Sequence, residues 1–186
     1  EWEKTYGGLD DEDPYDVIQT QDKGFLILGE TSSFGGTLDI YIIKTDSAGN
    51  HLWSRVFNGT SYHRGTTIKQ TIYGGYLMVG TTLNYGAGNG DMYVVKMNST
   101  GQTQWSKTFG GADDDDAINF IELSDGNIIV LGYNNSFNSN GYRNICLIKI
   151  NSSGNLIWSK MYEENHSDLA YGLALAKDGG FFIAGM

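Results

Sequence analysis

The sequence predicts an all-β fold in which one small antiparallel sheet recurs along the chain. Four tryptophans recur at intervals of 51, 52 and 53 residues, and turn glycines and lysines recur with them. A fixed period near 50 residues is typical of repeat architectures. The apolar runs in each repeat are five or six residues long and rich in β-branched and aromatic residues, which favours strands over helices. The tryptophans are Trp2, Trp53, Trp105 and Trp158.

Each repeat is predicted to contain four short strands. In the first repeat they cover residues 17–20, 25–29, 40–44 and 52–57. The connections are rich in Gly, Asn and Asp, which are typical of tight turns between strands. We treat residues 1–186 as a single domain with repeat units 2–52, 53–104, 105–157 and an incomplete 158–186. With residues 2–6 taken as the last strand of a preceding sheet, the chain contains fifteen strands.

The second and third strands of each repeat are continuous apolar runs, so both faces of each sheet are expected to be covered. Four-stranded sheets stacked face to face around an axis meet this requirement, and the repeat length fits the blade of a β-propeller. We therefore predict three full blades and a partial fourth, as part of a larger ring of about six to eight blades. The alternatives are a four-bladed ring completed by a partner's strand, and an open arc that assembles with copies of itself through unpaired blade edges.

A recurring turn motif carries a resemblance to known propellers. Asp/Asn-x-x-Gly-x-x-x-Trp occurs at residues 46–53, 98–105 and 151–158, and it resembles the tryptophan-docking pattern of quinoprotein-like propellers. The longer pattern at residues 2–8, 29–31 and 39–50 is similar to the surface propeller repeats of secreted and cell-envelope proteins of archaea and bacteria. The similarity covers the whole chain and loosens at residues 58–59 and 161–165. It implies the fold but not an activity, because propellers carry many unrelated functions.

Composition limits the classes of partner and the cellular locations that the sequence predicts. The net charge of −10 and the pI near 4.5 argue against nucleic acid, which rewards basic patches. No apolar run is long enough to predict a membrane span in this segment. Richness in Asn, Ser, Thr, Tyr and Gly favours an extracellular or cell-surface location. Five Asn-x-Ser/Thr sequons are candidates for glycosylation: Asn58, Asn98, Asn134, Asn151 and Asn165.

The single cysteine, Cys146, stands where the other repeats have Tyr41 and Tyr93. We expect it to be a small core residue. One cysteine excludes both an intramolecular disulfide and a metal site built from cysteines.

Acidic residues gather where the units differ, in the segment after each Gly-Gly. Units one and three have acidic tetrads at residues 10–13 and 113–116, which align position by position. Calcium is bound by several oxygen ligands, so these loops are candidate Ca²⁺ sites. Two other interpretations are open: solvated acidic loops that cap a turn, and a surface for a basic partner. The candidate metal ligands are Asp10, Asp11, Asp13, Asp113, Asp114, Asp115 and Asp116.

The repeats show no recognisable reaction motif, so we predict a non-catalytic surface module, a scaffold for adhesion or assembly with protein or glycan partners. The alternative is a carbohydrate-binding or carbohydrate-active propeller with its site at the mouth of the channel. His63, His166 and a carboxylate that converge on one deep cavity would favour the enzyme, while His51 is expected to face solvent. Aromatic residues suited to stacking on sugars are Tyr62, Tyr85, Tyr133, Phe137 and Tyr142.

Overall fold

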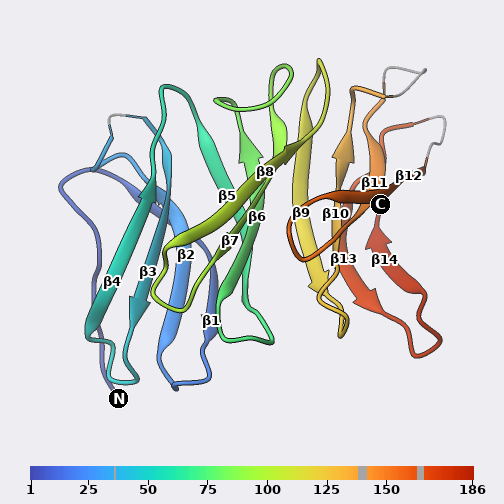
Figure 1. Cartoon of the computed structure of the whole chain (residues 1–186). Coiled ribbons are helices and arrows are strands. Elements are labelled where there is room, and N and C mark those ends of the chain that lie inside the picture. The colour runs from blue at the N-terminus through green and yellow to red at the C-terminus, as the bar shows by residue number, and fades with distance from the viewer. Residues whose placement is uncertain (36, 138–141, 163–165) are drawn as a thin grey trace.

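The computed structural model of the chain describes residues 1–35, 37–137, 142–162 and 166–186. These residues contain fourteen strands and no helix, which confirms the all-β prediction. The strands form three four-stranded antiparallel sheets and one two-stranded sheet, each with its strands in chain order. Figure 1 shows the sheets side by side in a row that does not close into a ring, with the first sheet at one end and the two-stranded sheet at the other.

The strand boundaries repeat from sheet to sheet. The first sheet comprises β1 (Glu12–Gln19), β2 (Phe25–Thr31), β3 (Asp39–Thr45) and β4 (His51–Phe57); the second, β5 (His63–Gln70), β6 (Tyr76–Thr82), β7 (Asp91–Met97) and β8 (Thr103–Phe109); the third, β9 (Asp115–Glu122), β10 (Ile128–Asn134), β11 (Asn144–Ile150) and β12 (Leu156–Tyr162); the hairpin, β13 (Ala170–Leu175) and β14 (Phe181–Gly185).

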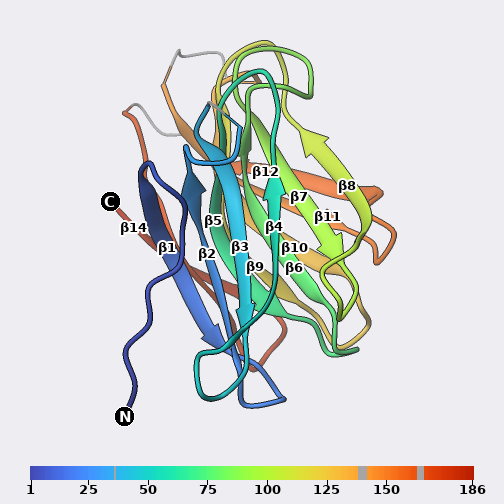
Figure 2. The same cartoon turned by 90° about the vertical axis from the view of Figure 1, so that its left-hand side faces the viewer.

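The sheets pack face to face, and the core lies between them (Figure 2). One face of the first sheet, with Leu26 and Ile42, packs on Ile68 and Met78 of the second sheet. All seven residues of β6 and of β10 are buried, because a neighbouring sheet covers each face of these strands. Burial on both faces explains why these strands are continuous apolar runs, as the sequence predicts.

Two predicted strand boundaries are wrong. Residues 2–6 form no strand, so the described chain contains fourteen strands rather than fifteen. The first strand of each sheet begins earlier than its apolar run, because polar residues at its start still pair with the second strand: Glu12 lies opposite Thr31, and Asp115 lies opposite Asn134. Half of each acidic tetrad therefore belongs to a strand.

The repeated tryptophan docks on the next sheet. A Cβ atom added to Gly101 would lie 2.7 Å from the Trp53 ring, and one added to Gly154 would lie 3.0 Å from the Trp105 ring. Both glycines have a φ near +75 to +79°, which the turn between the third and fourth strands requires and which glycine adopts at low cost. Trp2 occupies the same place over Gly49 of the first sheet. The repeat predicts equivalent surroundings for Trp53, Trp105 and Trp158. This prediction is confirmed for Trp53 and Trp105 and is wrong for Trp158.

Trp158 differs from the other tryptophans of the fourth strands. The hairpin beyond it has no turn between a third and a fourth strand, and the Trp158 side chain is 36% exposed. The tryptophans are also less buried than the sequence suggests, since Trp53 and Trp105 are only half-buried.

Cys146 is 1% exposed, which confirms it as a core residue. Burial, more than any other cause, raises the pKa of its thiol to about 12. At the equivalent position the Tyr41 ring contacts Phe34 at 5.3 Å, whereas Cys146 and Phe137 line a cavity of about 250 Å³. The cavity lies where the shorter side chain leaves space that a tyrosine ring fills in the first sheet.

Cys146→Tyr is expected to raise the free energy of unfolding by about 0.5–2 kcal/mol, because filling a cavity with the residue found in the other repeats restores packing. Urea unfolding of the two proteins measures the difference. Tyr93→Cys in the second sheet is the reciprocal control and is expected to destabilise the fold. A destabilised Cys146→Tyr variant would show that the cavity has a different shape from the space around Tyr93.

Candidate functional site

The connecting loops of all three sheets meet at one end of the molecule, which we call the loop end. There the first strand of each sheet begins and the second strand ends, so Glu12, His63 and Asp115 occupy equivalent positions opposite Thr31, Thr82 and Asn134. The segments that the sequence singles out as candidate sites converge on this end. The contacts of the side chains in these segments show whether they are free for chemistry at the loop end or hold the loops in place.

Asp115 organises the loops of the third sheet. Its side chain is fully buried, and its Oδ2 accepts hydrogen bonds from the Gly111 N–H at 2.8 Å and the Ser136 hydroxyl at 2.6 Å. Its Oδ1 accepts from the Asn135 N–H at 3.0 Å. The carboxylate therefore ties the Gly-Gly segment to the loop between β10 and β11.

Glu12 has the same role in the first sheet. Its Oε1 accepts hydrogen bonds from the Gly8 N–H at 3.1 Å and the Thr31 hydroxyl at 2.9 Å. Hydrogen bonding, first from Ser33 and then from Gly8 and Thr31, lowers the pKa of this carboxyl group. In each tetrad, one carboxylate, Glu12 or Asp115, therefore holds the segment after Gly-Gly in place through hydrogen bonds.

The other members of the third sheet's tetrad face outward or join the second sheet. Asp116 Oδ1 accepts a hydrogen bond from the Thr81 hydroxyl at 2.6 Å, and Asp114 Oδ1 accepts one from the Gly90 N–H at 3.2 Å. The exposed members of the two tetrads are Asp10, Asp11, Asp13, Asp113 and Asp114. Across the described ranges, no group of three or more His, Cys, Asp or Glu side chains is arranged to surround a metal ion.

Calcium binding by the exposed aspartates stays a prediction. Binding to the folded state alone raises the melting temperature by mass action. Calorimetry in millimolar CaCl₂ and in EDTA, with NaCl added to equal ionic strength, measures the effect. A melting temperature that is higher in calcium for the natural chain and unchanged for Asp113→Asn would support a site at that loop. Equal melting temperatures would leave only solvated acidic loops.

His63 takes the place of Asp115 in the second sheet. Its ring is 1% exposed, packs beside Tyr85 and Tyr93, and contacts the Asn84 amide through Nε2. Among the described residues, His63 Nδ1 and Asp39 Oδ2 are buried without a hydrogen-bond partner. Burial lowers the pKa of His63, and the Asp39 carboxylate acts in the opposite direction.

The lowered pKa of His63 predicts a loss of stability on mild acidification. The unfolded chain takes up a proton near the ordinary pKa of 6.5, whereas the folded chain binds it only at lower pH. The contribution of His63 is therefore fully present above pH 6.5 and is lost as the pH falls toward the lowered pKa. Melting temperatures between pH 5 and 8 should fall more steeply for the natural chain than for His63→Gln. Parallel curves would contradict a neutral buried imidazole.

The other two histidines, His51 and His166, do not contact His63 in the structure described. His51 is exposed at the start of β4, as expected. The His166 ring lies 6.4 Å from the Tyr142 ring, before the hairpin, whereas His63 packs within the second sheet. The contacts that the structure describes therefore do not bring His63 and His166 together.

Exposed aromatic residues recur on the loop between the second and third strands. Phe34, Tyr85 and Phe137 occupy equivalent positions and are 46%, 53% and 62% exposed. Tyr85 and Phe137 are among the aromatic residues predicted from the sequence, whereas Phe34 is not. Phe34 follows Thr31 by three residues, just as Tyr85 follows Thr82 and Phe137 follows Asn134, so the repeat spacing contains the signal that identifies it. These three rings form the repeated aromatic feature of the loop end.

Two of the predicted aromatic residues instead connect neighbouring sheets. The Tyr133 hydroxyl donates to the Ala170 carbonyl at 2.6 Å, and the Tyr62 hydroxyl donates to Glu30 Oε1 at 2.9 Å. Glu30 is 2% exposed and also accepts from Tyr15, which sequence reasoning missed. Burial, together with the hydrogen bond to Glu30, raises the pKa of Tyr62.

The sequons differ in accessibility. Asn58 is exposed, and Asn134 is 3% exposed at the end of β10. Asn98 and Asn151 are half-buried, and each side-chain oxygen accepts backbone N–H hydrogen bonds within its own turn. Asn165 lies outside the described residues. Among the four sequons within the described residues, Asn58 therefore has the most accessible side chain.

Comparison with known proteins yields structural likeness only. No family model matches the chain, and no curated protein does. A crystal structure of a protein of unknown function from Bacteroides caccae superimposes with a TM-score of 0.60 at 14% identity, over 93% of this chain and 53% of that one. A hypothetical protein from Leishmania major gives a TM-score of 0.34 at 11% identity, over 97% and 83% of the two chains. This chain spans about half the length of the Bacteroides protein.

No helix in the part of the chain that the structure describes is long and apolar enough to cross a membrane. The structural likeness supports the fold and bears on no activity. The structure therefore establishes an all-β arrangement of stacked antiparallel sheets, which fits a propeller-like fold.

Proposed function

We propose that this chain is a non-catalytic propeller module of a secreted or cell-surface protein, acting as a scaffold for adhesion or assembly. The observation that supports it is how the carboxylates of the loop end are used. Asp115 and Asp116 accept hydrogen bonds from backbone N–H groups and hydroxyls that hold loops and neighbouring sheets together. A general acid or base needs a carboxyl group free to exchange a proton with substrate.

The three sheets act in this proposal as three blades, with the hairpin as the start of a fourth in a larger ring. The support is the repeated docking of tryptophan on the turn of the following sheet, which gives each pair of neighbours the same relation. The resemblance to surface propeller repeats of archaeal and bacterial envelope proteins supports the same assignment.

Carbohydrate binding at the loop end is a second candidate, because Phe34, Tyr85 and Phe137 present three exposed rings at one end of the molecule. Exposed aromatic faces are suited to stacking on sugar rings. A glycan array probed with the natural chain and with Tyr85→Ala tests it. Binding that Tyr85→Ala weakens supports this candidate, and an array without signal removes it.

The surface location is tested on intact native cells. Brief trypsin treatment, followed by mass spectrometry of the released peptides, should yield peptides of this chain before any peptide of a cytoplasmic marker. The spent medium is analysed in the same way, and Asn58 peptides are searched for attached glycans. Peptides that appear only after lysis would contradict the proposal.

A further inference from the structure

The second sheet carries a cavity of about 370 Å³ at the loop end. Tyr85 lies on the loop between β6 and β7, Tyr93 belongs to β7, and the other lining residues, Ser106, Lys107 and Thr108, belong to β8. The volume is near the lower end of the range for small-molecule sites, about 300–1,000 Å³. The cavity is therefore of a size for a ligand of one or two rings.

The Tyr85 ring in this cavity packs on two buried rings. Its centroid lies 6.1 Å from that of Tyr93 and 5.7 Å from that of His63, with interplanar angles of 30° and 32°. His63 and Tyr93 are 1% and 6% exposed, whereas Tyr85 is 53% exposed. The buried rings therefore support Tyr85 from within the sheet and leave much of its ring accessible.

Asn84 holds the loop that carries Tyr85. Its Oδ1 accepts hydrogen bonds from the Thr60 N–H at 3.0 Å and the Thr60 hydroxyl at 2.8 Å, and its Nδ2 donates to the Ser61 carbonyl at 2.8 Å. The residue before Tyr85 is thus tied to the segment between the first two sheets. A ring that is held in place before binding loses less conformational entropy when a ligand packs on it.

Hydroxyl groups line the cavity beside Tyr85. Thr108 lies opposite Tyr93 in the pairing of β7 with β8, and Ser106 forms a hydrogen bond with the Tyr93 hydroxyl. Burial raises the pKa of Tyr93, so its hydroxyl group stays protonated at neutral pH. The cavity therefore offers uncharged hydrogen-bond donors and acceptors next to an aromatic ring.

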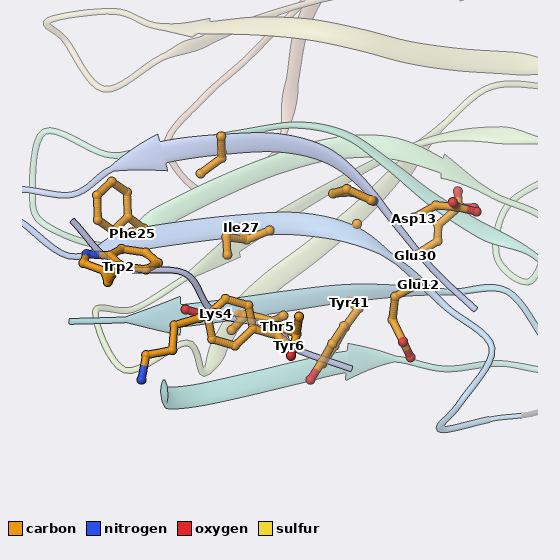
Figure 3. Close-up of a pocket in the computed structure, with 14 residues that line it drawn as sticks. Trp2, Lys4, Thr5, Tyr6, Glu12, Asp13, Phe25, Ile27, Glu30 and Tyr41 are labelled. Carbon is orange, nitrogen blue, oxygen red and sulfur yellow. The ribbon is translucent and has the colours of Figure 1, made fainter. Parts of the chain in front are cut away.

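The equivalent positions of the other two four-stranded sheets are more apolar. Phenylalanine replaces Tyr85 in both, and valine or methionine replaces Thr108: the residues are Phe34 and Val56 in the first sheet, and Phe137 and Met161 in the third. The cavity on the first sheet, about 570 Å³, has a mainly apolar lining in which Phe25 and Ile27 accompany Tyr41 (Figure 3). The row of hydroxyl groups is therefore specific to the second sheet.

A neutral pyranose sugar matches this lining. One face of the sugar ring carries C–H groups that pack on an aromatic ring, and its edge carries hydroxyl groups that form hydrogen bonds. The net charge of −10 disfavours acidic saccharides. The charged lining residue, Lys107, packs toward the third sheet, where a Cβ atom added to Gly154 would lie 2.8 Å from its Cγ. A neutral sugar therefore fits the cavity better than an acidic one.

We propose that a neutral pyranose sugar binds in this cavity, with its C–H face on Tyr85 and its hydroxyl groups bonded to Ser106 and Thr108. The proposal rests on the second candidate function, carbohydrate binding at the loop end, and assigns that binding to the second sheet. It does not depend on the scaffold function.

The test is a titration of the natural chain with glucose, galactose, mannose and N-acetylglucosamine, followed by backbone amide NMR shifts. At least one sugar should shift the amides of residues 84–93 and 106–108, with a dissociation constant on the order of millimolar. Tyr85→Ala should bind that sugar at least about tenfold more weakly, and Tyr85→Phe, which keeps the ring, within about threefold of the natural chain. Thr108→Val, which introduces the residue of the first sheet, should bind about threefold to tenfold more weakly.

Phe34→Ala and Phe137→Ala are the matched controls, because they remove the equivalent exposed rings and should leave the affinity unchanged. Circular dichroism melting checks that all variants are folded. The absence of shifts with all four sugars up to about 100 mM overturns the proposal. So does tighter binding of glucuronate than of glucose. If Phe137→Ala weakens binding as much as Tyr85→Ala, the assignment to the second sheet is wrong while carbohydrate binding at the loop end stands.

Discussion

Trp105→Ala is expected to lower the free energy of unfolding by about 2–4 kcal/mol. The ring packs on the Gly154 turn of the third sheet, and its Nε1 donates a hydrogen bond to the Ser152 carbonyl at 3.1 Å. Its removal opens space between two sheets and leaves that carbonyl without this donor. The expected loss is smaller than for a fully buried tryptophan, because Trp105 is half-buried. Urea unfolding followed by circular dichroism measures it.

Trp158→Ala is the matched control for this prediction. Trp158 occupies the equivalent position of β12 and is 36% exposed, with no equivalent turn in the hairpin beyond it. Its replacement should cost less than about 1 kcal/mol. Equal losses for the two variants would show that the docked turn contributes nothing.

Asp115→Ala is expected to destabilise the fold by about 2–4 kcal/mol. The fully buried carboxylate accepts hydrogen bonds from the Gly111 and Asn135 N–H groups and from the Ser136 hydroxyl. Without it, the half-buried Gly111 and Asn135 N–H groups lose their acceptor, and the Ser136 hydroxyl keeps only the longer hydrogen bond to the Asp113 carbonyl at 3.3 Å. Thermal and urea unfolding measure the loss, and Asp115→Asn should lie between the two proteins because one acceptor oxygen remains.

Asp113→Ala controls for the loss of a negative charge from the same loop. Asp113 is exposed, and its replacement should change the stability by less than about 0.5 kcal/mol. If Asp113→Ala costs as much as Asp115→Ala, charge in the loop rather than the buried hydrogen bonds stabilises the third sheet.

The fold was accessible from the sequence because its determinants are local and repeated. The apolar runs give the middle strands of each sheet, and the turn before each tryptophan needs a glycine with positive φ, as at Gly101 and Gly154. The outer limits of the first strands were missed because their starts are polar. Glu12 and Asp115 belong to strands through backbone pairing with Thr31 and Asn134, which hydrophobicity does not reveal.

The candidate site was less predictable, because the sequence shows which residues are charged but not where their side chains point in the fold. Successive residues of a strand point to opposite faces, so neighbouring aspartates of one tetrad have different surroundings. Asp115 is buried among loop donors, Asp116 bonds to the second sheet, and Asp113 is exposed. Glu30 escaped notice because its partners, Tyr15 and Tyr62, are distant in sequence and meet it only when two sheets pack together.

The repeated docking of one sheet's tryptophan on the next sheet is tested most directly by an experimental density map of the chain that resolves the indole rings. The expected map shows Trp2 over Gly49, Trp53 over Gly101 and Trp105 over Gly154, with the four-stranded sheets stacked face to face. Indole rings in unlike surroundings, or sheets that do not stack, would contradict the repeated blade.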